Sequence, residues 1–143
     1  MKDFPIDFEL YIGWTTCVTG LFHTDMGYFD FLLRENSATR LLVALRDDSH
    51  HSNNVVWLQN FNNQQIHNQE LGSRQNFQVM SVLNINFTLV AFTQMRVDFG
   101  PPVSYSMVSE LVEVNYLTGI NFVRLQCNDM TVYTVDVDCK EHP

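Results

Sequence analysis

The residues best suited to chemistry lie in one short polar segment, Asp47-Asp48-Ser49-His50-His51-Ser52. Carboxylates and imidazoles together could bind a metal ion, because both are common ligands of zinc and other transition metals. Neighbouring residues of a turn point in divergent directions, however, and no third ligand follows at a standard spacing. We therefore interpret residues 47–52 as a solvated hairpin loop and expect neither a metal nor another cofactor.

The acidic residues give no clearer indication of catalysis. Glu110 and Glu113 do not fall on one face of a strand, whereas Asp136 and Asp138 do. Alternating acids on a strand usually form only a solvated face. The sequence also contains no nucleophile elbow, phosphate-binding loop or dinucleotide fingerprint. We predict that the chain is not an enzyme.

The composition limits the classes of partner. The 143 residues carry a formal net charge of −8, with only eight Lys and Arg residues. Binding to nucleic acid or to an anionic membrane requires a basic patch, and the sequence contains none. Asn and Gln crowd residues 53–78 and supply amide donors and acceptors in place of charge. Neither a nucleic acid nor a membrane is an expected partner.

Three cysteines, Cys17, Cys127 and Cys139, are widely spaced along the chain. Their number and spacing fit neither a dense disulfide framework nor a zinc site with paired ligands, so we expect three free thiols. The first residues lack the apolar run of a signal peptide, and no segment reaches the length of a membrane helix. These features favour the cytoplasm or the nucleus; secretion without a signal peptide is left open.

The dominant pattern of the sequence is a succession of short segments rich in Val, Phe, Tyr, Leu and Thr. Such segments favour β-strands, so strands must position the candidate residues described above. Turn residues such as Asn84-Ile85-Asn86 separate the segments at intervals of about ten residues, which is typical of a β-sandwich. Within the first segment, alternation places Phe29, Phe31 and Leu33 on one face. We predict about ten strands or more in two antiparallel sheets. The predicted strands are Met26–Leu33, Arg40–Arg46, Asn54–Asn60, Phe77–Leu83, Phe87–Phe92, Met95–Phe99, Glu110–Tyr116, Ile120–Gln126 and Thr131–Val137.

Two segments in the second half of the chain carry a family pattern. Residues 87–99 read FTLVAFTQMRVDF and are followed by Gly-Pro-Pro, and residues 112–124 read VEVNYLTGINFVR. They resemble the C-terminal half of a galectin, where a strand ending in D-F precedes a proline-containing connection and a final strand pair. Phe29–Leu33 and Asn54–Asn60 resemble the F-x-I-N-L and V-V-x-N strands of that family. The resemblance covers about residues 8–126 and implies a galectin-like jelly roll, a two-sheet antiparallel β-sandwich, over residues 1–143.

The sugar site of galectins lies on one concave sheet and begins with an H-x-N-x-R strand. The resemblance places this motif on Leu42, Ala44 and Arg46, so two of its three polar groups are aliphatic here. The Asn that ends the V-x-N strand in galectins persists as Asn60. The site has therefore lost two of the groups that hydrogen-bond galactose.

A W-x-x-E-x-R strand completes the sugar site of galectins. Counting on from Asn60 places His67 at the stacking Trp, Glu70 at the Glu and Gly72 at the Arg. No Trp occurs between residues 58 and 143, so the indole that stacks on the sugar is absent in every register. The resemblance thus implies weak or absent β-galactoside binding at a degenerate site formed by Arg46, Asn60, His67 and Glu70.

Two other features are candidates for binding a partner. Trp57 is a large apolar residue of a type enriched at interfaces, although a core position is equally open to it. Residues 128–143 depart from the family and form an extension with an extra strand. Alternation places Tyr133, Val135 and Val137 on its more apolar face, which we expect to be buried against this domain or a partner.

The leading hypothesis is a galectin-like interaction module that binds a protein partner, including a second copy of itself, and performs no chemistry. The alternative is a divergent lectin that binds another glycan through the amides of Asn60–Gln69. A viral or structural sandwich with accidental similarity is a third interpretation, because sandwiches recur without common function.

Overall fold

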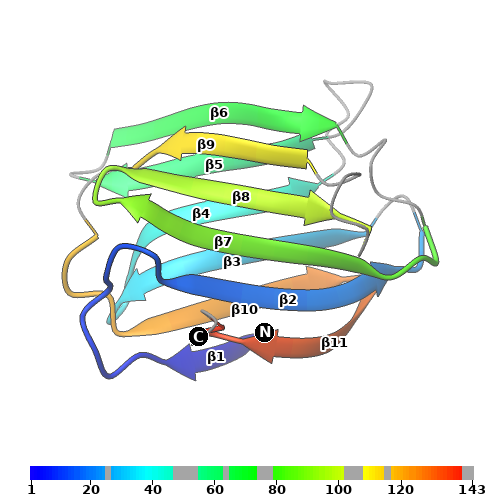
Figure 1. The fold of residues 1–143 in the computed structure, drawn as a ribbon, viewed down its shortest axis with the longest axis horizontal. Coiled ribbons are helices and arrows are strands. Elements are labelled where there is room, and N and C mark those ends of the chain that lie inside the picture. The colour runs from blue at the N-terminus through cyan, green and yellow to red at the C-terminus, as the bar shows by residue number, and fades with distance from the viewer. Residues whose placement is uncertain are drawn as a thin grey trace.

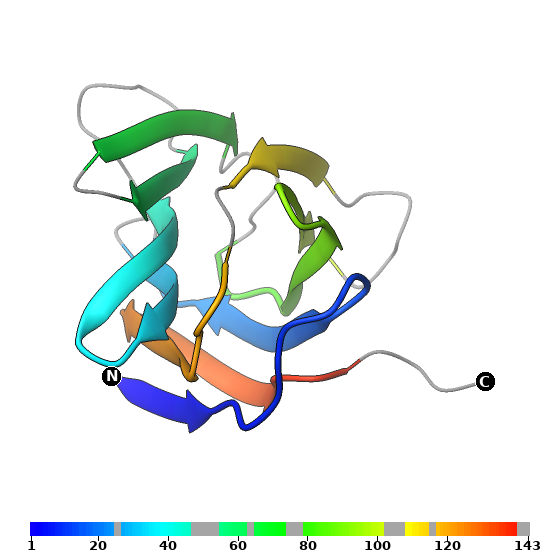
Figure 2. The same cartoon turned by 90° about the vertical axis from the view of Figure 1, so that its left-hand side faces the viewer.

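The computed structural model contains strands and turns and no helix among the residues that it describes, so no described helix could span a membrane. The predicted all-β sandwich is confirmed. Two antiparallel sheets pack face to face, as Figures 1 and 2 show from two directions. The described residues are 1–24, 27–46, 55–62, 65–73, 79–101, 108–114 and 117–139.

Eleven described strands build the two sheets, and every neighbouring pair is antiparallel. The six-stranded sheet has the order β1 (Lys2–Pro5), β10 (Phe122–Asn128), β3 (Tyr28–Glu35), β4 (Ala38–Arg46), β5 (Val55–Asn62) and β6 (Gln65–Ser73). The five-stranded sheet has the order β11 (Met130–Asp136), β2 (Thr15–Phe22), β7 (Leu83–Ala91), β8 (Gln94–Gly100) and β9 (Val108–Glu113).

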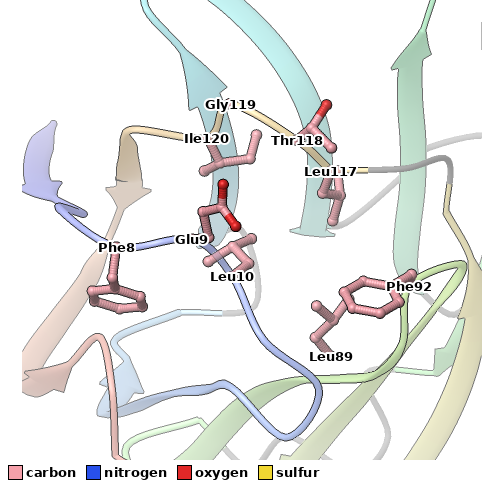
Figure 3. A pocket seen from close by; sticks show the side chains of 9 residues that line it. All are labelled: Phe8, Glu9, Leu10, Leu89, Phe92, Leu117, Thr118, Gly119 and Ile120. Carbon is pink, nitrogen blue, oxygen red and sulfur yellow. The ribbon is translucent and has the colours of Figure 1, made fainter.

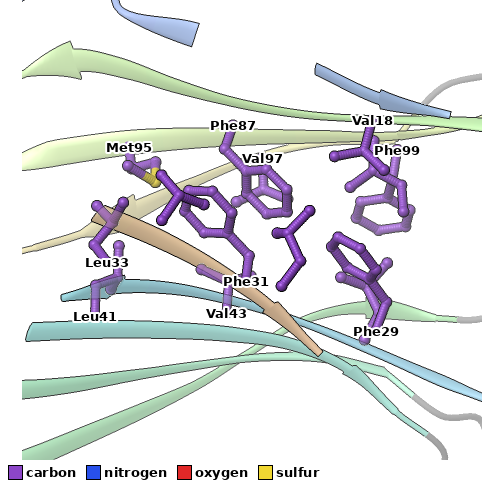
Figure 4. Close-up of a cluster of buried hydrophobic side chains, with 14 of the residues drawn as sticks. Val18, Phe29, Phe31, Leu33, Leu41, Val43, Phe87, Met95, Val97 and Phe99 are labelled. Carbon is purple, nitrogen blue, oxygen red and sulfur yellow. The ribbon is translucent and has the colours of Figure 1, made fainter. Parts of the chain in front are cut away.

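The core fills the space between the sheets (Figure 4). Phe29, Phe31 and Leu33 are fully buried on β3, as their alternation predicted. Phe87 meets them from β7, and its ring stacks on that of Phe31 with centroids 3.9 Å apart and planes within 6°. Because each strand contributes every second residue to this layer, the alternation of the sequence fixes which face of each sheet is apolar.

One predicted turn is wrong. Residues 84–86 lie inside β7, where Asn84 pairs with Gly100 and Asn86 with Asp98. Leu83, Ile85 and Phe87 are buried, while the two asparagines between them are half-buried. The asparagines therefore occupy the outer face of a regular strand. Of the predicted strand 77–83, residues 77 and 78 lie outside the described residues, and residues 79–82 form a turn before β7. The predicted hairpin loop 47–52 also lies outside the described residues.

The expectation of three free thiols is also wrong, because Cys17 and Cys139 form a disulfide with Cα atoms 5.9 Å apart. Pairing of β11 with β2 sets Asp136 opposite Cys17, and the Cys139 N–H then donates to the Thr15 carbonyl at 2.9 Å. The two thiols are thus brought together across 122 residues of sequence. Cys127 is free and exposed.

Candidate functional site

The positions of the degenerate sugar site lie on three neighbouring strands. Arg46 is on β4, Asn60 on β5, and His67 and Glu70 on β6. The backbone register sets Asn60 opposite His67 and Trp57 opposite Glu70. The side chains of residues 46–78 lie outside the described part of the structure, so a binding role for these four positions stays a prediction.

On β4 the outer face of the sheet is aliphatic. Leu41, Val43 and Leu45 are fully buried in the core, so Leu42 and Ala44 lie on the opposite face. Ala44 is only 4% exposed. These two residues replace hydrogen-bonding groups of the galectin motif, so neither position on β4 offers a sugar a polar side chain.

The backbone register of β5 against β4 shows where Asn60 lies along the sheet. Gln59 is opposite Leu42, whereas Asn60 is opposite Leu41, a core residue of β4. In an antiparallel pair, directly opposed residues belong to the same side of the sheet. The backbone therefore puts position 59 in the row of Leu42.

The other half of the same outer face is charged. Arg124 on β10 donates from Nε and Nη2 to the two carboxyl oxygens of Asp3, at 2.8 and 3.1 Å. This hydrogen bond is the main reason that the pKa of Asp3 lies below its ordinary value. The guanidinium groups of Arg34 and Arg124 lie 5.7 and 5.4 Å from the centroid of Phe122. The sequence analysis did not identify this cluster, because its members come from three separate strands.

Tyr133 points to solvent, contrary to the expectation that it shares a buried face with Val135. The register of β11 against β2 passes from Val132 opposite Gly20 to Thr134 opposite Thr19, so a β-bulge falls at Tyr133. A bulge inserts one residue and reverses the alternation beyond it. Tyr133 is 54% exposed, while Val132 and Val135 both pack against the core.

A groove of about 290 Å³ separates β1 from β11, the edge strands of the two sheets. These two strands lie side by side at the lower edge of the molecule in Figure 1. Phe4, Leu125 and Val132 line the groove together with Tyr133 and the free Cys127. The groove can accept an apolar side chain, and both strands beside it can accept a further strand.

Asp136 and Asp138, the two acids at the end of β11, make structural hydrogen bonds. The Tyr11 hydroxyl donates to Asp138 Oδ1 at 2.5 Å, and this hydrogen bond raises the pKa of Tyr11 above its ordinary value. The Asp138 N–H donates to Asp136 Oδ1 at 3.0 Å. These carboxylates therefore stabilise the position of the chain at the end of β11. Among the described residues, no group of three or more His, Cys, Asp or Glu is placed to hold a metal ion; His50 and His51 lie outside them.

Comparison with known proteins decides the fold. No protein-family model matches the sequence, and no curated protein matches it. Many solved structures do match, and several of them are galectins. Galectin LEC-6 of Caenorhabditis elegans superposes with a TM-score of 0.70 at 13% identity, covering 94% of this chain and 87% of the other. The chain has a galectin-like fold.

Two further galectins support this fold. Xenopus laevis galectin-Ib gives a TM-score of 0.67 at 14% identity, with 94% of this chain and 98% of the other covered. Sheep galectin-11, in a complex with glycerol, gives 0.66 at 10% identity, with 94% and 95% covered. The uncovered part of this chain is shorter than residues 128–143, so the galectin-like fold includes part of that segment.

Proposed function

We propose that this chain is a non-catalytic interaction module that binds a protein partner through the groove between β1 and β11. The observation that carries the proposal is the combination, at one edge, of two open strands and the exposed Tyr133. Edge strands present unpaired backbone donors and acceptors that another chain can pair with. Tyrosine is enriched among the residues that dominate binding energy.

A second copy of this chain is the first partner to test. One structural neighbour, CG-16 from chicken liver, is a homodimeric agglutinin; it matches with a TM-score of 0.62 at 16% identity. Two copies related by a twofold axis would each present the same edge to the other, as an isologous interface requires. The short β1 and the bulged β11 would then meet their counterparts.

We expect Tyr133→Ser to weaken this association by about 2 kcal/mol, roughly 30-fold, because it removes the exposed aromatic ring that lines the groove. Sedimentation velocity over a concentration series measures dimer formation, and affinity capture with each variant as bait measures binding to another protein. The matched control is Leu111→Ser, since Leu111 is also 54% exposed but lies on β9, at the other edge of the sheet. Unchanged mass and unchanged partners for Tyr133→Ser would contradict the proposal.

Binding of β-galactosides is proposed to be weak or lost. Leu42 and Ala44 remove two polar groups from the outer face of β4, and the sequence has no Trp after Trp57.

The remaining amides on β5 and β6 support a second candidate function, in which a divergent lectin binds a different glycan through residues 60–69. This stretch is rich in Asn and Gln, whose side chains both donate and accept hydrogen bonds.

Lactose should bind no more tightly than about 1 mM, or roughly 4 kcal/mol, because neither a stacking platform nor most hydrogen-bonding groups are available. Titration calorimetry at high sugar concentration measures this, with a lactose-binding galectin in the same buffer as the positive control. A glycan array separates the second candidate from the first. Micromolar lactose affinity would show that the interpretation of β4 is wrong.

The location of the chain in the cytoplasm or the nucleus is part of the proposal, and the Cys17–Cys139 disulfide provides its test. Disulfides persist in oxidising compartments and are rare in the cytosol. Thiol labelling of the native protein taken directly from cells should find both cysteines reduced if the chain acts in the cytoplasm. A fully oxidised pair would instead support a secreted protein.

A further inference from the structure

A second cavity, of about 230 Å³, lies apart from the groove. Three connecting segments form it: Phe8–Leu10 between β1 and β2, Leu89 and Phe92 around the turn after β7, and Leu117–Ile120 before β10. Figure 3 shows their side chains around a common space. The volume is below the range of about 300–1,000 Å³ that is usual for drug-sized ligands, so it suits a single side chain.

Part of the wall of this cavity is apolar and fixed by packing. Leu89, Leu117 and Ile120 are buried members of the core cluster, so their positions are fixed by packing. Phe92 is 46% exposed and forms part of the opening. An aliphatic chain that entered here would exchange contact with water for contact with these side chains.

Glu9 is the single charged side chain among the described residues that line the cavity. Figure 3 shows its carboxyl group within the ring of lining side chains. No hydrogen bond or ion pair joins this carboxylate to another described residue. The cavity therefore combines apolar side chains with an exposed carboxylate that has no counter-charge among the described residues.

Arg40, which contacts the lining residue Thr118, is already paired with a carboxylate. Arg40 Nη1 donates to Glu35 Oε1 at 3.1 Å and to the Thr118 carbonyl at 3.2 Å. The Glu35 carboxylate in turn lies so close to Gly119 that a Cβ at that position would clash with it. Arg40 is thus matched by Glu35, which leaves the charge of Glu9 unmatched. The net charge of −8 further favours a cationic ligand.

We propose that this cavity binds a lysine side chain of the protein partner, with the methylenes on Leu117, Ile120 and Phe92 and the ammonium group on Glu9. Lysine fits because it carries a compact charge at the end of a flexible apolar stem. Arginine fits less well, because its planar guanidinium group carries more N–H donors than the cavity has acceptors. This inference rests on the proposed function and adds a second contact site for the partner.

The test uses three capped Ala-X-Ala peptides, in which X is lysine, Nε-acetyllysine or norleucine. Titration followed by ¹⁵N NMR should shift the amide signals of Thr118, Gly119 and Ile120 with the lysine peptide. The other two peptides should bind about tenfold more weakly, a difference of about 1.4 kcal/mol, because they lack the charge. Equal shifts with all three peptides, or no shift at Gly119, would overturn the proposal.

Glu9→Gln keeps the shape of the side chain and removes its charge, and it should weaken the lysine peptide about tenfold. Glu113→Gln is the matched control, because Glu113 is exposed, bonds to Gln94 and does not line the cavity. An unchanged affinity in Glu9→Gln would sink the inference. Tyr133→Ser should retain binding of the lysine peptide. The proposal for the groove and the proposal for this cavity can therefore be contradicted separately.

Discussion

Replacement of Phe31 by alanine should lower the free energy of unfolding by about 3–5 kcal/mol, which is the usual cost of truncating a buried Phe. The ring of Phe31 is fully buried between the two sheets, and it stacks on Phe87 with centroids 3.9 Å apart. Alanine would leave a cavity that the surrounding strands cannot close, because each is held by its backbone hydrogen bonds. Urea unfolding followed by fluorescence gives the change by linear extrapolation.

Phe92→Ala is the matched control for this measurement. Phe92 has the same side chain but is 46% exposed in the turn between β7 and β8. Its truncation should cost no more than about 1 kcal/mol, because less apolar surface returns to water. Similar losses in the two variants would mean that the core does not lie where Phe31 and Phe87 meet.

The alternation of apolar residues made most of the strands predictable. In β3, Phe29 and Phe31 face the core, and the same pattern identified the strands that became β4, β5, β8 and β11. Two of the strands that alternation did not predict, β1 and β6, are the edges of the six-stranded sheet, although the resemblance to galectins had placed a strand over residues 67–72. β1 has only four residues, three of them exposed, so its sequence is too short to show an alternating apolar pattern.

β2 was missed for a different reason, although it lies inside its sheet. Its sequence, TTCVTGLF, contains several small polar residues and Gly20. A Cβ at position 20 would lie 2.6 Å from the Thr131 carbonyl oxygen, so glycine allows β11 to approach. A glycine that weakens the strand pattern locally is thus required by a partner strand more than 100 residues later in the sequence.

The candidate site was predictable only in part. The resemblance to galectins indicated the strands β4 and β5, but it could not fix the register in which Gln59 rather than Asn60 is opposite Leu42. A count along the sequence carries no information about bulges, and in the pairing of β6 with β5 one falls at Leu71. The bulge at Tyr133 was hidden in the same way, and it decides which residues of β11 face solvent.

Deletion of residues 129–143 should unfold or aggregate the protein, because β11 seals the edge of β2. Val18 and Phe22 on β2 are fully buried, and Met130 and Val135 of β11 belong to or pack against the same core. The deletion also removes the Cys17–Cys139 disulfide, whose loop of about 120 residues is worth roughly 4–5 kcal/mol in the chain-entropy account. Together these losses approach the total stability of a typical domain, about 5–15 kcal/mol.

Cys139→Ser separates the two contributions, since it breaks the disulfide and leaves β11 in place. Hydrogen bonds from β11 and the residues after it still hold the strand: Thr19 and Thr134 join their hydroxyls at 2.5 Å, and the Thr16 hydroxyl donates to the Val137 carbonyl. This variant should therefore melt at a lower temperature and remain monodisperse, whereas the deletion variant should expose the edge of β2 and associate. Light scattering during thermal melting compares them. A deletion variant with the mass and melting temperature of the full chain would show that β11 is dispensable for folding and serves the partner alone.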